Sequence, residues 1–245
     1  MKEWLNKAIC GVQKTENFKK GIYYLGDSRE LIKEVPTESV DLILTDPPFG
    51  LKIDEYDNDE IFFELEDELW RVLKPNRWLV FYYSVKKLLN ITKIKRFEYV
   101  WQIICEFSST FSKCVLGDRK YIPILVFRKG NPKISYRRYD ILPAGELPFV
   151  YEKVRDPQFK PTITTSLLLQ MFSKEEELVF DPFAGYGSIP IVCEYFNRRW
   201  MAFEIDKRKY DIGVKFIRED KVGRIPSGEE ERRKQRNFND YIKSA

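Results

Sequence analysis

The stretch DLILTDPPFG (41–50) places a carboxylate, two prolines and an aromatic ring directly after an apolar run. A proline fixes its own φ and restricts the residue before it, so the Asp46 side chain and the Pro47 carbonyl are held as two acceptors. Pro48 stiffens the same turn. Two fixed acceptors suit an amine with two N–H bonds, and the Phe49 ring suits stacking on a planar partner. Read alone, the stretch also fits a proline-rich strand terminator with Phe49 in the core.

A second stretch, LVFDPFAGYGS (178–188), runs from an apolar strand through Asp181 and two glycines into a helix. Gly185 and Gly187 let the backbone approach a ligand at the carboxyl edge of a sheet, where open α/β folds bind ligands. Glu204 follows at the end of the next strand, where a carboxylate can accept both hydroxyls of a ribose. This pattern predicts a nucleoside ligand, and its alternative is an ordinary tight strand–helix turn.

The glycine-rich turn does not match the dinucleotide or phosphate-loop patterns. Pro190 stands where a third glycine is expected, and the turn lacks the Lys-Ser/Thr pair of a phosphate-cradling loop. We therefore expect a nucleoside without a phosphate chain.

The elements that must position these residues alternate in a βαβ rhythm, which favours a parallel sheet. We expect strands over 21–26, 41–45, 77–83, 177–180 and 200–205, and helices over 28–35 with a Ser cap, 57–74, 85–89, 162–172, after Gly187 and over 207–218. Two aromatic β runs, 99–107 and 121–127, interrupt the rhythm. The tail, 228–245, reads as a solvated helix or a frayed end.

Charge is unevenly distributed along the chain. Residues 113–160 hold eleven Lys and Arg against five Asp and Glu, whereas the net charge of all 245 residues is +4. We interpret 113–160 as a basic insertion in a single domain spanning 1–245, and as a candidate region for recognising an anionic partner.

Composition excludes several kinds of chemistry. The chain has no histidine, which removes the usual general base of hydrolases, and its four cysteines form no CxxC pair, so neither a metal site nor a disulfide framework is expected. No apolar run is long enough to span a bilayer, and the N-terminus is charged, so we expect a cytoplasmic protein without a membrane partner.

Taken together, DPPFG (46–50), KPT (160–162) and DPFAGYGS (181–188) resemble the amino-methyltransferases of nucleic acids that use S-adenosylmethionine. RNA guanine-N2 methyltransferases carry a similar DPPY/F-type motif, but their glycine-rich motif comes first in the chain. Here it comes about 135 residues later. This order resembles the β class of DNA amino-methyltransferases over nearly all of 21–218. The resemblance implies a doubly wound, mostly parallel, Rossmann-like α/β sheet that is circularly permuted and carries the small basic insertion.

Carried over to this sequence, the resemblance implies that Asp46, Pro47, Pro48 and Phe49 are catalytic. It implies that S-adenosylmethionine is bound by Asp27 at the adenine amino group, by Glu204 at the ribose, and on the methionine side by Asp181, Phe183, Gly185, Gly187 and Ser188. Lys160 and Thr162 are weaker cofactor candidates, because Asp156-Pro157 replaces the family's usual His-Pro in that motif.

The implied partner is double-stranded DNA, from which a base is turned out so that its exocyclic amine can be methylated. Lys120, Lys129, Arg137 and Arg138, interleaved with tyrosines, are the candidate DNA contacts, although a solvated polar hairpin also fits that segment. The resemblance associates an Asp at the first position of the DPPF motif with methylation of adenine N6. The alternatives are cytosine N4, an RNA amine and an inactive DNA-binding relative. The resemblance leaves open a homodimer and a restriction endonuclease partner. Cytosine-C5 methylation is not expected, because no cysteine follows a proline.

Overall fold

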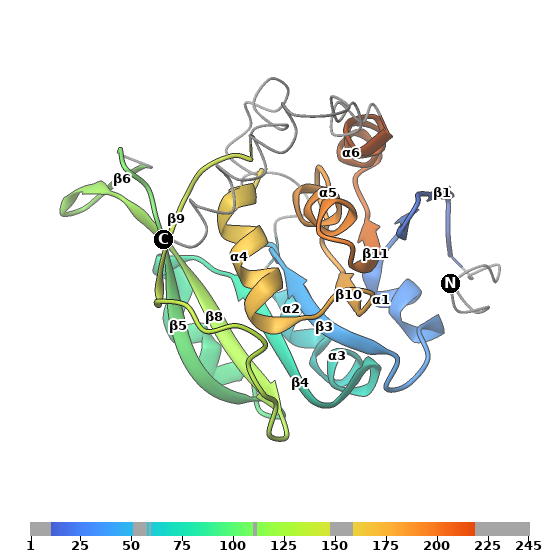
Figure 1. Ribbon diagram of the computed structural model, residues 1–245, viewed down its shortest axis with the longest axis horizontal. Helices are drawn as coiled ribbons and strands as arrows, with labels where there is room; N and C mark the ends of the chain where they lie inside the picture. The colour runs from blue at the N-terminus through green and yellow to red at the C-terminus, as the bar shows by residue number, and fades with distance from the viewer. Residues whose placement is uncertain (1–10, 51–57, 59, 110–111, 148–158, 219–245) are drawn as a thin grey trace, which may run out of the picture.

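The structure is a computed structural model that describes residues 11–50, 58, 60–109, 112–147 and 159–218. Within these residues a nine-stranded sheet runs through the molecule in the order β1-β2-β11-β10-β3-β4-β8-β5-β9 (Figure 1). Its strands are β1 (Lys14–Asn17), β2 (Gly21–Leu25), β3 (Val40–Thr45), β4 (Leu73–Tyr82), β5 (Glu98–Glu106), β8 (Tyr121–Lys129), β9 (Ile141–Pro143), β10 (Leu178–Asp181) and β11 (Arg199–Glu204). A separate hairpin consists of β6 (Ser112–Cys114) and β7 (Gly117–Arg119).

The five strands from β2 to β4 are parallel, and β8 is antiparallel to both of its neighbours. Their residues alternate between two cores, because successive side chains of a strand point to opposite faces. On β2, Tyr23 faces the core covered by α4 (Thr162–Phe172), α5 (Ser188–Tyr195) and α6 (Lys207–Arg218), and Tyr24 faces the other core. The second face is covered by α1 (Ser28–Leu31), η2 (Ile32–Glu34), α2 (Glu60–Glu64) and α3 (Glu66–Val72). The sheet is therefore doubly wound, as predicted.

The register of the parallel strands gathers their carboxyl ends at one edge. Glu204 pairs with Leu25, Asp181 pairs with Ala202, and Thr45 pairs with Phe81. The two motifs from the sequence thus emerge from neighbouring strands, β3 and β10, at the same edge. The permuted connection remains a prediction.

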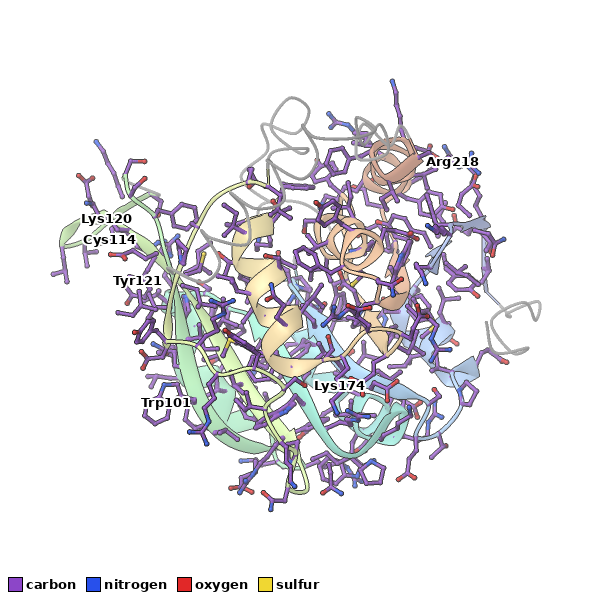
Figure 2. All side chains as sticks on the ribbon, in the orientation of Figure 1. Trp101, Cys114, Lys120, Tyr121, Lys174 and Arg218 are labelled. Atoms are coloured by element: carbon purple, nitrogen blue, oxygen red, sulfur yellow. The ribbon has the colours of Figure 1, made fainter. Side chains whose placement is uncertain are left out.

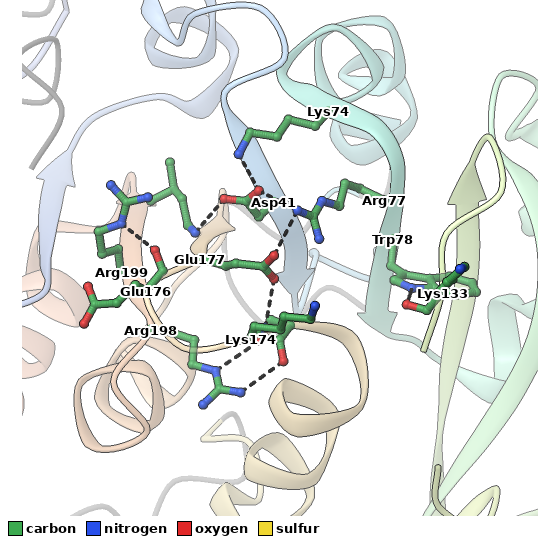
Figure 3. Close-up of polar contacts among 12 residues, drawn as sticks. Asp41, Lys74, Arg77, Trp78, Lys133, Lys174, Glu176, Glu177, Arg198 and Arg199 are labelled. Atoms are coloured by element: carbon green, nitrogen blue, oxygen red, sulfur yellow. Dashed lines mark hydrogen bonds and ion pairs between the residues drawn. The ribbon is translucent and has the colours of Figure 1, made fainter. Parts of the chain in front are cut away.

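Ionic contacts join the strands at their amino ends, opposite the two motifs (Figure 3). Asp41, on β3, has a side chain only 3% exposed, and it forms ion pairs with Lys74 and with Arg77 at 3.1 Å. Its second oxygen accepts the backbone N–H of Leu178 at 2.9 Å. Arg77 also pairs with Glu177 at 2.9 Å. Strands β3, β4 and β10 are thereby joined at the end far from the two motifs.

Several element boundaries differ from those predicted. The segment expected as one helix over 57–74 is divided at Leu65 into α2 and α3 within its described part, and it ends at Val72. β4 begins early, at Leu73, which pairs with Val40. The helix over 28–35 is capped by Asp27 and becomes 3-10 at Ile32. The helices over 162–172 and 207–218 are confirmed.

The basic segment 113–160 is not an insertion along its whole length. Its apolar run forms β8, which lies between β4 and β5 and contributes Ile124 and Leu125 to the two cores. Among the described residues of this segment, the hairpin and the stretch 130–147 lie outside the sheet's main body, apart from the short edge strand β9. In the described part of the chain, no helix is long and apolar enough to cross a membrane.

Candidate active site

Asp46 leaves the carboxyl end of β3 and meets a buried cation. The Nζ atom of Lys160 lies 2.5 Å from Asp46 Oδ2, and the lysine side chain is 7% exposed. The same Nζ lies 5.8 Å from the centre of the Phe49 ring. Lys160, predicted as a cofactor contact, therefore lies against the DPPFG motif. Its charge stabilises the ionised form of the carboxylate.

The other residues of the DPPFG turn differ in burial. Pro47 is buried, whereas Pro48 and Phe49 are half-buried. The Phe49 ring packs edge-on against Tyr83 at 5.8 Å between ring centres. This contact fixes the ring on one side, and its partial exposure is what a stacking role requires.

A single hydroxyl joins the two motifs. Thr45 Oγ1 donates to Asp181 Oδ1 at 2.6 Å, and the same oxygen accepts the backbone N–H of Phe183 at 3.1 Å. Thr45 was not among the predicted site residues. Its place, directly before Asp46 and on the strand beside β10, is a signal that could have identified it.

Asp181 is fully buried at the end of β10. Burial raises the pKa of its carboxyl group to about 8, although the hydrogen bonds from Thr45 and Phe183 act in the opposite direction. Its Oδ2 atom is buried without a hydrogen-bond partner in the described part of the chain. An unpaired buried carboxyl oxygen is unfavourable in isolation and favours a donor or a cation beside it.

The glycine-rich turn contains one open position and one packed position. Gly185 has φ +54°, and apart from its chain neighbours no heavy atom of the described residues lies within 4 Å of where a Cβ would stand. Gly187 has φ +78°, and a Cβ there would lie 3.0 Å from the Ile217 side chain. Gly187 precedes α5, whose first residue is the buried Ser188. Gly185 therefore borders space that a ligand could occupy, and Gly187 permits helix packing.

Glu204 closes the turn from the next strand. Its Oε2 accepts the Gly185 N–H at 2.6 Å, and its Oε1 accepts the Asp206 N–H at 2.7 Å. The Gly185 carbonyl accepts the hydroxyl of Tyr23, which was also not predicted. Burial raises the pKa of Glu204, an effect opposed by these backbone donors and by Lys209.

Asp27 lies at the same edge, because the Gly26 N–H donates to the Glu204 carbonyl at 2.8 Å. Its carboxylate caps α1 at Arg29 N, 2.9 Å away, and pairs with the Arg29 guanidinium at 2.6 Å. Partial burial raises the pKa of Asp27, but the hydrogen bonds and charge of Arg29 outweigh this, and the net shift is downward.

Thr162 makes internal contacts at the start of α4. Its hydroxyl donates to Glu146 Oε2 at 2.6 Å and accepts the Leu147 N–H at 2.8 Å. These bonds hold 146–147 against the helix, so the observed role of Thr162 is to position that segment. The unusual Asp156-Pro157 pair lies outside the described residues.

The four predicted DNA contacts separate in space. Lys129 is buried, and its Nζ donates to the carbonyls of Trp70 at 2.8 Å and Leu73 at 2.6 Å. This corrects the prediction of Lys129 as a DNA contact, because a phosphate cannot reach a buried ammonium group that is hydrogen-bonded to backbone carbonyls. Lys120 and Arg137 are exposed, and the Arg138 guanidinium stacks 4.6 Å from the Tyr136 ring.

Comparisons with known proteins match the part of the chain that contains several of these residues. A family model described as DNA methylase matches residues 157–215, which contain the Lys160 motif, the glycine-rich turn and Glu204. The type II methyltransferase M.HpaI of Haemophilus parainfluenzae is 24% identical over 216 residues, covering 74% of this chain and 69% of its own.

Over residues 157–215 the chain is similar to the DNA methylase family.

Solved structures of methyltransferases share its fold. A complex of M1.HpyAVI with SAM superposes with a TM-score of 0.67 at 20% identity, covering 80% of this chain and 98% of that one. The PvuII DNA methyltransferase, described as cytosine-N4-specific, has a TM-score of 0.67 at 18% identity and covers 93% and 95% of the two chains. These likenesses confirm the Rossmann-like sheet predicted for this chain.

Proposed function

We propose that this DNA methylase transfers a methyl group from S-adenosylmethionine to the exocyclic amine of a base turned out of double-stranded DNA, and that the base is adenine. The observation that carries the proposal is the Asp46–Lys160 pair beside the glycine-rich turn, coupled to it through Thr45. An amine acceptor and a nucleoside-type site thus share one edge of the sheet.

The residues of the turn fit S-adenosylmethionine. The open space beside Gly185 and the unpaired Oδ2 of Asp181 can receive its methionine part, and Glu204 stands where ribose hydroxyls are expected. When bound, the cofactor supplies a methyl group activated on a sulfonium. Asp181 is suited to a cation, because a positive charge beside it favours its ionised form.

The chain's own residues prepare the amine. Its lone pair is delocalised into the base, so the amine is a weak nucleophile. Asp46 and the Pro47 carbonyl can each accept one N–H, which localises the lone pair on nitrogen. The Lys160 ammonium group pairs with the Asp46 carboxylate and fixes one of its oxygens. Phe49 is available to stack on the base. No covalent enzyme intermediate is needed, because positioning and acceptors suffice for direct displacement.

The choice of adenine rests on the family association of Asp at the first motif position. Both adenine and cytosine offer an exocyclic amine, so the geometry supports either ring. Cytosine N4 is the second candidate, and it is favoured by the likeness to a fold neighbour described as cytosine-N4-specific.

The test is incubation of the purified protein with methyl-labelled cofactor and duplex DNA, with transfer RNA as a parallel substrate. We expect label in DNA only, and N6-methyladenine in the digested nucleosides by mass spectrometry. N4-methylcytosine would replace the base assignment and leave the mechanism standing. Label in transfer RNA alone would overturn the DNA substrate.

A further inference from the structure

The hairpin of β6 and β7 carries an unusual tip. Cys114 pairs with Gly117, so Val115 and Leu116 are the two central residues of its turn. They are 101% and 94% exposed, more than any other large apolar side chain in the described residues. Two-residue hairpin turns favour Gly, Asn and Asp at these positions, so turn geometry does not account for a valine and a leucine.

The hairpin leaves the sheet at the edge that carries the active site. Thr45 pairs with Phe81, and Tyr82 pairs with Ile124 of β8, so the start of β8 extends past the level of Asp46. β8 lies two strands from β3, which is about 10 Å sideways. From Tyr121 the chain continues outward through β7, and five extended residues reach about 16 Å further. Figure 1 shows β6 projecting from the body of the molecule at the upper left.

Cations surround this apolar tip. Lys113, Arg119 and Lys120 lie on the hairpin or at its base, against one carboxylate, Asp118. Figure 2 shows Cys114 and Lys120 on the projecting element, away from the helices. Lysine and arginine around a small apolar tip complement a phosphate backbone with a stacked apolar interior, whereas a protein partner would be better matched by a broader apolar surface.

We infer that the Val115–Leu116 tip inserts into duplex DNA beside the target base and stabilises the duplex from which that base has been turned out. Apolar side chains that enter a base step unstack it, and turning out a paired base costs a few kcal/mol that such an insertion can offset. The inference rests on the proposed function. It assigns to the hairpin a role separate from methyl transfer.

The experiment compares V115S/L116S with the wild type and with L89S, which alters an 86% exposed leucine on η3 (Val85–Lys93) as a matched control. The substrates are two duplexes with the sequence that the wild type methylates, one paired and one mismatched at the target base. A mismatched base is turned out more easily. Single-turnover methylation rates are measured at saturating DNA, and cofactor affinity is measured by calorimetry.

We expect V115S/L116S to slow methylation of the paired duplex about tenfold and to approach the wild-type rate on the mismatched duplex, with cofactor affinity unchanged. L89S should match the wild type on both. An unchanged rate on the paired duplex, or an equal loss on both duplexes, would overturn the inference. So would a change in oligomeric state by sedimentation without a rate difference, since it would indicate a second copy as the partner. A wild type that labels no DNA would instead refute the proposed function.

Discussion

A buried lysine beside Asp46 changes what that carboxylate can do. At 2.5 Å from Oδ2, the Lys160 ammonium stabilises the charge of Asp46 and limits its rotation. A carboxylate held in this way is a better fixed acceptor for an amine N–H than a freely rotating one. We therefore propose Asp46 as the acceptor and Lys160 as its positioning residue.

Replacing Asp46 with Ala should reduce methyl transfer by at least about 100-fold, because the variant loses one of the two preorganised acceptors at the reacting nitrogen. Cofactor affinity, measured by calorimetry, should stay within about threefold, since Asp46 is not among the contacts proposed for S-adenosylmethionine. D46N keeps one acceptor oxygen and should retain more activity than D46A. Equal rates for wild type and D46A would remove Asp46 from the mechanism.

Lys160 distinguishes a positioning role from a cofactor role. K160M should lower kcat by about tenfold or more and leave KM for the cofactor nearly unchanged, because the variant loses the charge that holds Asp46. K160R keeps the charge and should recover part of kcat. If K160M raises the cofactor KM and spares kcat, Lys160 belongs to the cofactor site as the sequence predicted.

At the scale of single residues, local sequence patterns proposed candidate groups but not their partners. Asp46, Asp181 and Glu204 were proposed because they stand at the ends of apolar strands, and their roles stay predictions. The Lys160–Asp46 pair, in contrast, joins positions more than 100 residues apart, and no local pattern encodes such a contact. Lys129 was mistaken for a surface cation, because a buried lysine with backbone carbonyl partners has the same local sequence as an exposed one.

Among the elements, β8 shows why the basic segment was misjudged. The run YIPILVF alternates poorly because it is buried on both faces, and its charged neighbours suggested a surface insertion. The long helices over 162–172 and 207–218 were predicted correctly, since their lengths exceed what short apolar strands allow. The hairpin was missed because its turn lacks the usual turn residues.

Two elements compete as the DNA-contacting surface. The segment 131–140 begins at the edge remote from Asp46, where Trp78 donates to the Lys133 carbonyl and Ser135 N–H donates to Met171. The hairpin stands at the catalytic edge. Their contributions can be separated by the salt dependence of DNA binding.

R137Q/R138Q should flatten the log–log salt slope by up to about one unit for each phosphate that the variant no longer neutralises, and K113Q/K120Q should do so independently. Fluorescence anisotropy with a labelled duplex, at several salt concentrations, measures both slopes. If R137Q/R138Q leaves the slope unchanged and K113Q/K120Q reduces it, DNA contacts the hairpin and the segment 131–140 is an ordinary solvated surface.

At the scale of the whole molecule, the two ends of the parallel strands differ among the described residues: a buried carboxyl group is paired at one end and left partly unpaired at the other. At one edge, Asp41 is neutralised by Lys74 and Arg77 and bonds to the backbone of β10. At the other edge, Asp181 is buried with one oxygen unpaired in the described part of the chain, which is unfavourable for folding. Proteins retain such groups at functional sites, where a ligand supplies the missing partner.

The last prediction concerns the stability of the whole fold and follows from the carboxyl group of Asp181. Its pKa is about 8 in the folded chain and 3.8 in the reference state, so between these values the folded protein retains a proton that the unfolded chain has released. The folded state binds more protons, and the contribution of Asp181 to stability falls as pH rises from about 4 to about 8.

D181N cannot ionise and avoids this loss. Its advantage should grow to the order of a few kcal/mol by pH 8. Thermal denaturation at pH 5, 6.5 and 8 should show a Tm difference between D181N and the wild type that widens with pH. D181N should also bind S-adenosylmethionine about tenfold more weakly, because the amide is a weaker acceptor than a carboxylate. A Tm difference that stays constant with pH would mean that Asp181 is already ionised in the folded protein.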